Sequence, residues 1–132
     1  MLKTFEDITK PLTEDEIKLI PHIVRIMRNH VGKKSAITNK RMREYLASDL
    51  NIPAIHDSRF RAIIHHITVN DILPLLTASA NGYFIAEVEE EANNYLESLE
   101  GRVHSIEHKK IAYTRQVKKY FKNKIKNQIA LL

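Results

Sequence analysis

Histidine residues are the groups in this sequence with the widest capacity for chemistry. The chain has seven of them, and His104 and His108 are four residues apart, as two metal ligands on one face of a helix would be. A zinc site needs three or four ligands, and neither cysteine nor an HExxH pattern is present to complete such a set. We therefore expect no bound metal and no other cofactor.

Carboxylates gather at Glu14-Asp15-Glu16 and at Glu89-Glu90-Glu91. Acid–base catalysis would require a base, a nucleophile or a substrate-binding group beside them, and the sequence pairs neither cluster with one. Acidic residues are favoured in the first turn of a helix, where the helix dipole is positive. The clusters therefore indicate helix starts, and we expect no enzymatic activity and no small-molecule substrate.

Basic residues offer another kind of chemistry, the binding of a polyanion. The formal net charge is +5, and lysine and arginine release counterions when they contact nucleic-acid phosphates. Arginine can also donate two hydrogen bonds to a guanine edge. Whether Arg59 and Arg61 can do so depends on the elements that present them.

Three helices are predicted in the first part of the chain. Thr13-Glu14-Asp15-Glu16 forms a capping box, which starts a helix that runs to Val31 before Gly32. Pro21 predicts a kink or a restart in this helix. The other helices are expected from Thr38 to about Asp49 and from about Asp57 to Thr68. The predicted inward residues are Ile17, Ile20, Val24, Met27 and Val31 in the first helix, Met42, Tyr45 and Leu46 in the second, and Phe60, Ile63, Ile64 and Ile67 in the third.

Two strands are predicted next, Leu73–Ala78 and Tyr83–Ala86. Asn81-Gly82 between them is a strong hairpin signal, because tight hairpin turns need positive φ angles. A hairpin alone is marginally stable, so a third strand at Ile37 is a further expectation.

From Glu87 a helical pattern continues almost to the end of the chain. Apolar residues follow an alternating four-three spacing, which is typical of a coiled coil, with Lys110 in one apolar slot and with Gly101 as a place for a bend. We call this stripe the seam; its residues are Ala92, Leu96, Leu99, Val103, Ile106, Tyr113, Val117 and Tyr120. The seam either joins two chains as a homodimer or folds back on the chain's own helices.

The order of helix, short strand, two helices and hairpin resembles the winged helix-turn-helix family of DNA-binding proteins. The resemblance rests on Thr38–Leu46, Phe60–Ile64 and Asn81–Ala86, and the whole chain is similar to small winged-helix proteins of phages and prophages. It implies a mainly α protein with an N-terminal arm (1–12), a winged helix-turn-helix domain of three helices and a β-hairpin wing (13–86), and a long C-terminal helix (87–132). It also implies a regulatory or replication-associated role in a phage or mobile element.

The residues expected to meet double-stranded DNA follow from placing Phe60 and its isoleucine companions in the core. Ser58, Ala62 and His65 then lie opposite, with Arg61 on one flank and Arg59 and His66 on the other. The second helix would set basic residues near a phosphate strand, and the wing tip would add a polar group. These further residues are Lys40, Arg41, Arg43 and Asn81.

An alternative is a protein-interaction module without enzymatic activity in a phage replication or assembly complex. The sequence also lacks an apolar run long enough to span a membrane and the pattern of a signal peptide, so we expect a cytoplasmic protein, in a bacterial cell or in the host of a phage.

Overall fold

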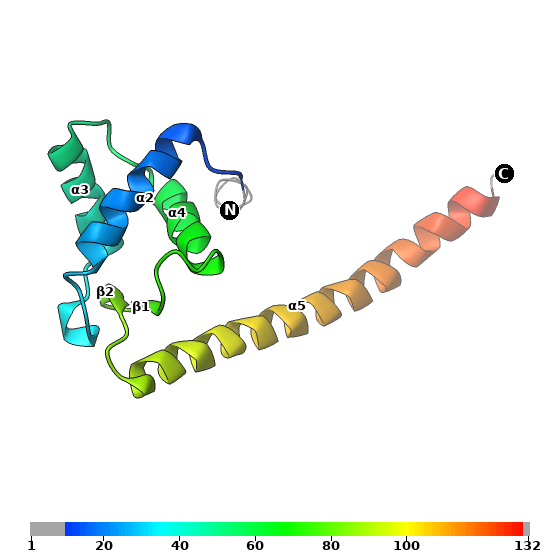
Figure 1. Ribbon diagram of the computed structural model, residues 1–132. Coiled ribbons are helices and arrows are strands. Elements are labelled where there is room, and N and C mark those ends of the chain that lie inside the picture. The colour runs from blue at the N-terminus through cyan, green and yellow to red at the C-terminus, as the bar shows by residue number, and fades with distance from the viewer. Residues whose placement is uncertain (1–9, 131–132) are drawn as a thin grey trace. The chain divides into compact units, whose positions relative to one another are not determined.

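A computed structural model describes residues 10–130 of the chain, with side chains through residue 122. Within this range the protein is mainly helical, with one antiparallel hairpin and a long C-terminal helix (Figure 1). Two compact units divide between Tyr95 and Leu96. The elements are α2 (Glu14–Met27), the 3-10 helix η1 (Lys33–Ser35), α3 (Asn39–Leu50), α4 (Asp57–Val69), β1 (Leu76–Ser79), β2 (Gly82–Ile85) and α5 (Glu89–Ala130). Predictions for residues 1–9 and 131–132 lie outside the described range.

The predicted capping box starts α2. The backbone N–H of Thr13 donates to Glu16 Oε1 at 2.8 Å, and that of Glu16 donates to Thr13 Oγ1 at 3.2 Å. One continuous helix passes through Pro21, so the predicted restart is wrong. Pro21 lies on the exposed side, where water can bond the carbonyl of Ile17 that proline leaves without a helical donor. The helix ends at Met27, earlier than predicted.

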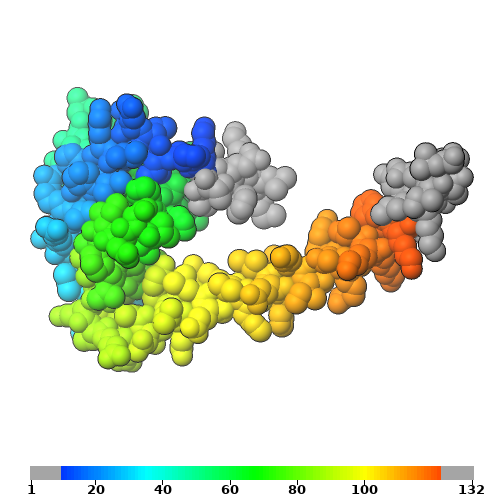
Figure 2. Space-filling model, turned by 45° about the vertical axis from the view of Figure 1, so that its right-hand side comes forward, coloured from blue at the N-terminus to red at the C-terminus, as the bar shows by residue number. Residues whose placement is uncertain are grey.

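The core of the first unit forms where α2, α3 and α4 meet. Phe60, Ile63 and Ile67 are fully buried and Ile64 nearly so, which confirms the predicted inward stripe of α4. In the space-filling view α2 (blue) and α4 (green) form one continuous packed surface (Figure 2). The inner face of α2 is formed by Leu19, Ile23 and Ile26, and that of α3 by Met42 and Leu46. Three residues that were predicted to face inward are exposed instead: Ile17, Val31 and Tyr45.

The hairpin packs on the link between α2 and α3. Ile37 exchanges both backbone hydrogen bonds with Tyr83, at 2.9 and 2.8 Å, so the predicted third strand is present as a single bridge. The positive φ of the turn falls on Gly82, at +121°, while Asn81 has no positive φ. A Cβ on Gly82 would lie 2.3 Å from the carbonyl oxygen of Ile37. Only glycine therefore fits where the hairpin approaches this link.

The start of α5, which belongs to the first unit, is joined to η1 by one carboxylate. Glu91 accepts hydrogen bonds from the backbone N–H of Lys33 at 2.9 Å and of Glu87 at 2.8 Å. These bonds hold the pKa of the Glu91 carboxyl below its ordinary value. The helix then continues without a break through Gly101. No described helix is long and apolar enough to cross a membrane.

Candidate nucleic-acid interface

One narrow ridge of α4 faces outward. Arg61 and His65, one turn apart, are exposed, and Asp57 begins the ridge one turn earlier. Arg61 Nη2 lies 3.3 Å from Asp57 Oδ2, with 55% of the arginine side chain exposed. Arg61 and His65 were predicted to face outward and do so. The ridge therefore presents a cation and an imidazole on a helix whose remaining positions up to Ile67 are largely covered.

Ser58 and Ala62 were predicted to lie on the outward face, and that prediction is wrong. Their exposed fractions are 1% and 4%. His56, which caps α4, lies 2.8 Å from the hydroxyl of Ser58 through its Nδ1 atom. The segment 10–12 lines a hollow with Ala62 and His65, and its Leu12 packs on the core. The outward ridge consequently lies one residue earlier in the sequence, at Asp57 and Arg61.

Arg59 was predicted to flank the DNA-binding face and instead makes internal bonds. Its Nη2 and Nε atoms donate to the two carboxylate oxygens of Glu16, at 2.6 and 2.7 Å. The same guanidinium donates to the backbone carbonyls of Lys10 and Pro11, both at 3.1 Å. Only 16% of the Arg59 side chain is exposed. These bonds fasten the segment before α2 across α4, which explains the burial of Ala62.

Arg43 is also an internal residue rather than the predicted phosphate contact. Its Nε donates to Asn39 Oδ1 at 2.6 Å, and its Nη1 donates to the carbonyl of Ile55 at 3.1 Å. The side chain is half-buried. Arg43 thus joins α3 to the loop that leads into α4.

Tyr83 links the hairpin to this surface, although no sequence pattern singled it out. Asn39 Nδ2 donates to the Tyr83 hydroxyl at 3.5 Å, and the Tyr83 ring lies 6.1 Å from that of Phe60. Burial raises the pKa of Tyr83, and the nearby charge of Arg61 opposes this shift. The start of α3, the ridge of α4 and strand β2 therefore converge around one tyrosine. No local pattern reveals this, because the contacts join residues far apart in the sequence.

The other predicted contact residues lie mostly on the surface. Lys40 is 80% exposed and lies 3.9 Å from Glu44, while Arg41 and Asn81 are exposed. His66 is half-buried, with its Nδ1 atom 3.3 Å from Asn70 Nδ2. Lys40 and Arg41 therefore remain available for an external anion.

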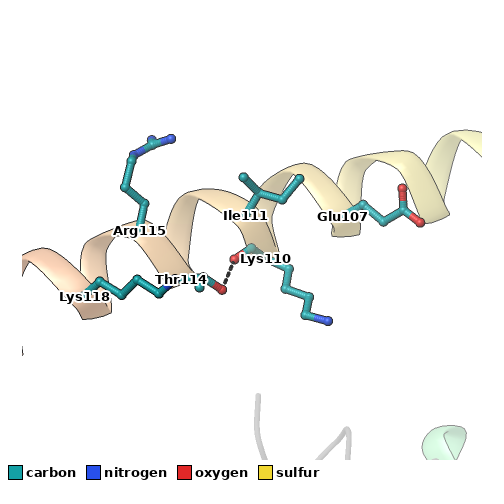
Figure 3. A pocket seen from close by; sticks show the side chains of 6 residues that line it. All are labelled: Glu107, Lys110, Ile111, Thr114, Arg115 and Lys118. Atoms are coloured by element: carbon teal, nitrogen blue, oxygen red, sulfur yellow. Dashed lines mark hydrogen bonds between the residues drawn. The ribbon is translucent and has the colours of Figure 1, made fainter.

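The seam of α5 is exposed from Leu96 to Tyr120. Its large apolar side chains from Leu96 to Tyr120 are between 37% and 69% exposed. A mixed polar stretch of the same helix borders it, where Thr114 Oγ1 donates to the carbonyl of Lys110 at 2.7 Å (Figure 3). The six residues drawn there belong to one helix, so they form an open surface hollow that does not enclose a ligand.

The rings of His104 and His108 lie with their centroids 4.3 Å apart and are tilted by 48° to each other. Within residues 10–122, no group of three metal-ligating side chains comes together.

Comparisons with known proteins identify no relative: no protein-family model, curated protein or solved structure matches this chain.

Proposed function

We propose that this protein binds double-stranded DNA through a winged helix-turn-helix domain, in which α3 and α4 form the helix-turn-helix and β1–β2 the wing. The observation that carries the proposal is the outward ridge of α4. Arg61 and His65 lie on it, and the exposed basic residues Lys40 and Arg41 lie on the preceding helix. In helix-turn-helix docking the second helix enters the major groove and the first crosses the phosphate backbone.

The ion pair with Asp57 does not prevent Arg61 from binding DNA. An exposed pair of this kind contributes about 0.2 to 1 kcal/mol, whereas a bidentate contact to guanine discriminates by about 1 to 3 kcal/mol. Asp57 can in turn accept a hydrogen bond from the amino group of cytosine. The ridge is therefore suited to a site that contains G·C pairs.

Selection from random duplex DNA at several salt concentrations tests this function. In the selected duplex, Arg61→Ala should weaken binding by about 1 to 3 kcal/mol and relax base choice at one position. Lys18→Ala is the matched control: it removes one exposed charge from α2 beside the hollow that contains Arg59. Two residues turn a helix by about 200°, so the Arg59 side chain leaves α4 roughly opposite to Arg61. Lys18, beside Arg59, is therefore on the side of the unit away from the proposed DNA-binding ridge. Unchanged affinity and base preference in Arg61→Ala would contradict the assignment.

The exposed seam supports a second part of the proposal, a homodimer formed through α5. A helix of 42 residues with an apolar stripe gains stability by burying that stripe against a partner. Replacing Leu99 and Val103 with Asp should yield a monomer by light scattering, while the first unit keeps its fold. An unchanged mass would dismiss the seam as the contact.

A protein-interaction module is the alternative, and the same exposed seam favours it. Retention of duplex DNA at low salt distinguishes the two functions, because phosphate contacts strengthen steeply as salt falls. If no duplex DNA is retained even at low salt, the seam and the ridge of α4 are better explained as surfaces that bind a protein partner.

A further inference from the structure

We propose that the seam binds a second copy of the chain in parallel and in register. This inference rests on the proposed homodimer and adds the direction of the two helices. The four-three spacing assigns Leu96, Val103, Lys110 and Val117 to the first apolar position of a heptad, called a. It assigns Leu99, Ile106, Tyr113 and Tyr120 to the second, called d.

The seam has the shape and exposure of an unfilled contact surface. Leu96, Leu99 and Val103 line a shallow groove together with the polar side chains at its edges, Glu100, His104 and Glu107. Leu99 and Val103 are 37% and 56% exposed. Such apolar rows accept the side chains of a facing helix as knobs in holes. Valine at two a positions is typical of a two-stranded parallel pair.

The flanking charges favour the parallel direction. Arg102 precedes the a position at Val103, and Glu107 follows the d position at Ile106, so both border the seam. In a parallel pair, the side chain at the first of these positions meets the one five residues further along the other helix. Arg102 of each copy would then meet Glu107 of the other, giving two ion pairs. Within the described chain, Arg102 Nη2 donates to Ser98 Oγ at 3.4 Å and neither Arg102 nor Glu107 forms an ion pair.

The antiparallel direction brings like charges together. An antiparallel pair that buries the whole stretch from Leu96 to Tyr120 is centred on residue 108. Residues beside that centre then lie next to their own copies, so Glu107 would face Glu107 and Lys109 would face Lys109. Like charges at such positions are destabilising. Lys110 would also lie against Ile106 of the second copy.

The charge of α5 is acidic at its start and basic toward its end. This distribution favours an antiparallel pair, but it acts over a longer distance. Its charges are mostly off the seam, on the outer faces of helices about 10 to 12 Å thick. Salt at 0.15 M screens charges beyond about 8 Å. The close pairs at Arg102 and Glu107 therefore decide the direction at physiological salt.

Lys110 fits the same arrangement. A single lysine among apolar a positions costs some stability but fixes the register and the number of strands. In a parallel pair both Lys110 stems lie in one layer, and each ammonium can extend along the helix surface to water. In a parallel pair in register, both copies of the first unit are attached at the same end of the paired helices. This arrangement suits two adjacent DNA half-sites.

Engineered cysteines test the direction without background, because the chain has none of its own. Leu99→Cys and Val117→Cys are prepared separately, and each is held in a thiol–disulfide buffer at 0.15 M salt. Each variant alone should give a disulfide-linked dimer as the main species on a non-reducing gel, since facing seam residues lie within bonding distance. His108→Cys, which points away from the seam, is the control and should stay uncrosslinked. Sedimentation equilibrium of the unaltered protein gives the mass independently.

Crosslinks formed only in a mixture of Leu99→Cys and Val117→Cys would show an antiparallel pair and overturn this inference while the homodimer stands. A mass of three or more chains would overturn the two-stranded pair. A monomeric mass at every concentration would instead remove the homodimer itself, and the direction with it.

Discussion

Glu16 and Arg59 are 43 residues apart in the sequence and joined by a bidentate ion pair, with Nη2–Oε1 and Nε–Oε2 distances of 2.6 and 2.7 Å. Their side chains are 14% and 16% exposed. The pair joins α2 to α4, while the same guanidinium binds the carbonyls of residues 10 and 11. The Arg59 hydrogen bonds lower the pKa of Glu16 from 4.5 to about 2.

This pair should make stability depend on pH in the acid range. Since the pKa of Glu16 is lower in the folded state, the pair stabilises fully above pH 4.5, and its contribution is lost as the pH falls from 4.5 to about 2. Glu16→Gln should lower the free energy of unfolding at pH 7 by about 1 to 3 kcal/mol. The difference from the wild type should shrink across that window. Urea titrations at pH 7, 4, 3 and 2 measure it.

Glutamine at this position keeps the capping box, so the variant isolates the ion pair. Glu14→Gln, an exposed carboxylate in the same first turn, is the control and should change stability by only a few tenths of a kcal/mol. If the difference in the free energy of unfolding between Glu16→Gln and the wild type stays the same at every pH, the ion pair contributes nothing.

Arg43 and Arg41 are two residues apart on α3 and should respond differently to truncation. Arg43→Ala removes the bonds to Asn39 and to the Ile55 carbonyl, so it should destabilise the fold by about 1 to 3 kcal/mol. Arg41→Ala, on the exposed surface, should leave stability within about 0.5 kcal/mol and weaken DNA binding. Thermal melts and salt-titrated DNA binding give both readouts. Equal stability of the two variants would refute the internal role of Arg43.

Two glycines make a contrasting pair. Gly82→Ala should cost more than about 2 kcal/mol, because a Cβ there would lie 2.3 Å from a backbone oxygen at a φ of +121°. Gly101→Ala should stabilise α5 by about 1 kcal/mol, since no atom lies within 4 Å of the added carbon. Circular dichroism during heating follows both changes. A tolerated Gly82→Ala would mean that the hairpin does not approach Ile37 as closely as described.

Charge exchange provides a separate check on the flanks of the seam. Arg102→Glu and Glu107→Arg should each weaken dimerisation roughly two- to thirtyfold, from two exposed pairs of about 0.2 to 1 kcal/mol each. The double exchange should restore it in a parallel pair. In an antiparallel pair the double variant places the arginine introduced at position 107 beside its own copy and restores nothing. Sedimentation at 0.15 M salt compares the four proteins.

The sequence predicted the elements better than their faces. The capping box at Thr13, the stripe headed by Phe60 and the bridge at Ile37 are confirmed, because each depends on local hydrogen bonding or on strong periodicity. The predicted restart at Pro21 is wrong, and α5 likewise runs unbroken through Gly101. Proline on an exposed helix face and glycine inside a long helix each weaken a helix without ending it.

The outward side of α4 was only partly predictable. Periodicity located the face opposite Phe60, but the burial of Ala62 depends on the segment 10–12, which carries no helical or strand pattern and was expected to be a separate arm. Arg59 and Arg43 look like surface cations in the sequence. Their partners, Glu16 and the Ile55 carbonyl, become neighbours only through tertiary packing.

From residue 96 to residue 122 of α5, nearly every side chain is exposed, whereas the core of the first unit is internal. Isolated helices are marginal in water, so in the proposed homodimer this part of α5 would owe its order to mass action between chains. On dilution the second unit should unwind while the first persists. Cellular abundance would thereby become a regulatory input for the proposed DNA binding, since scarce copies would keep a folded first unit without an ordered second unit.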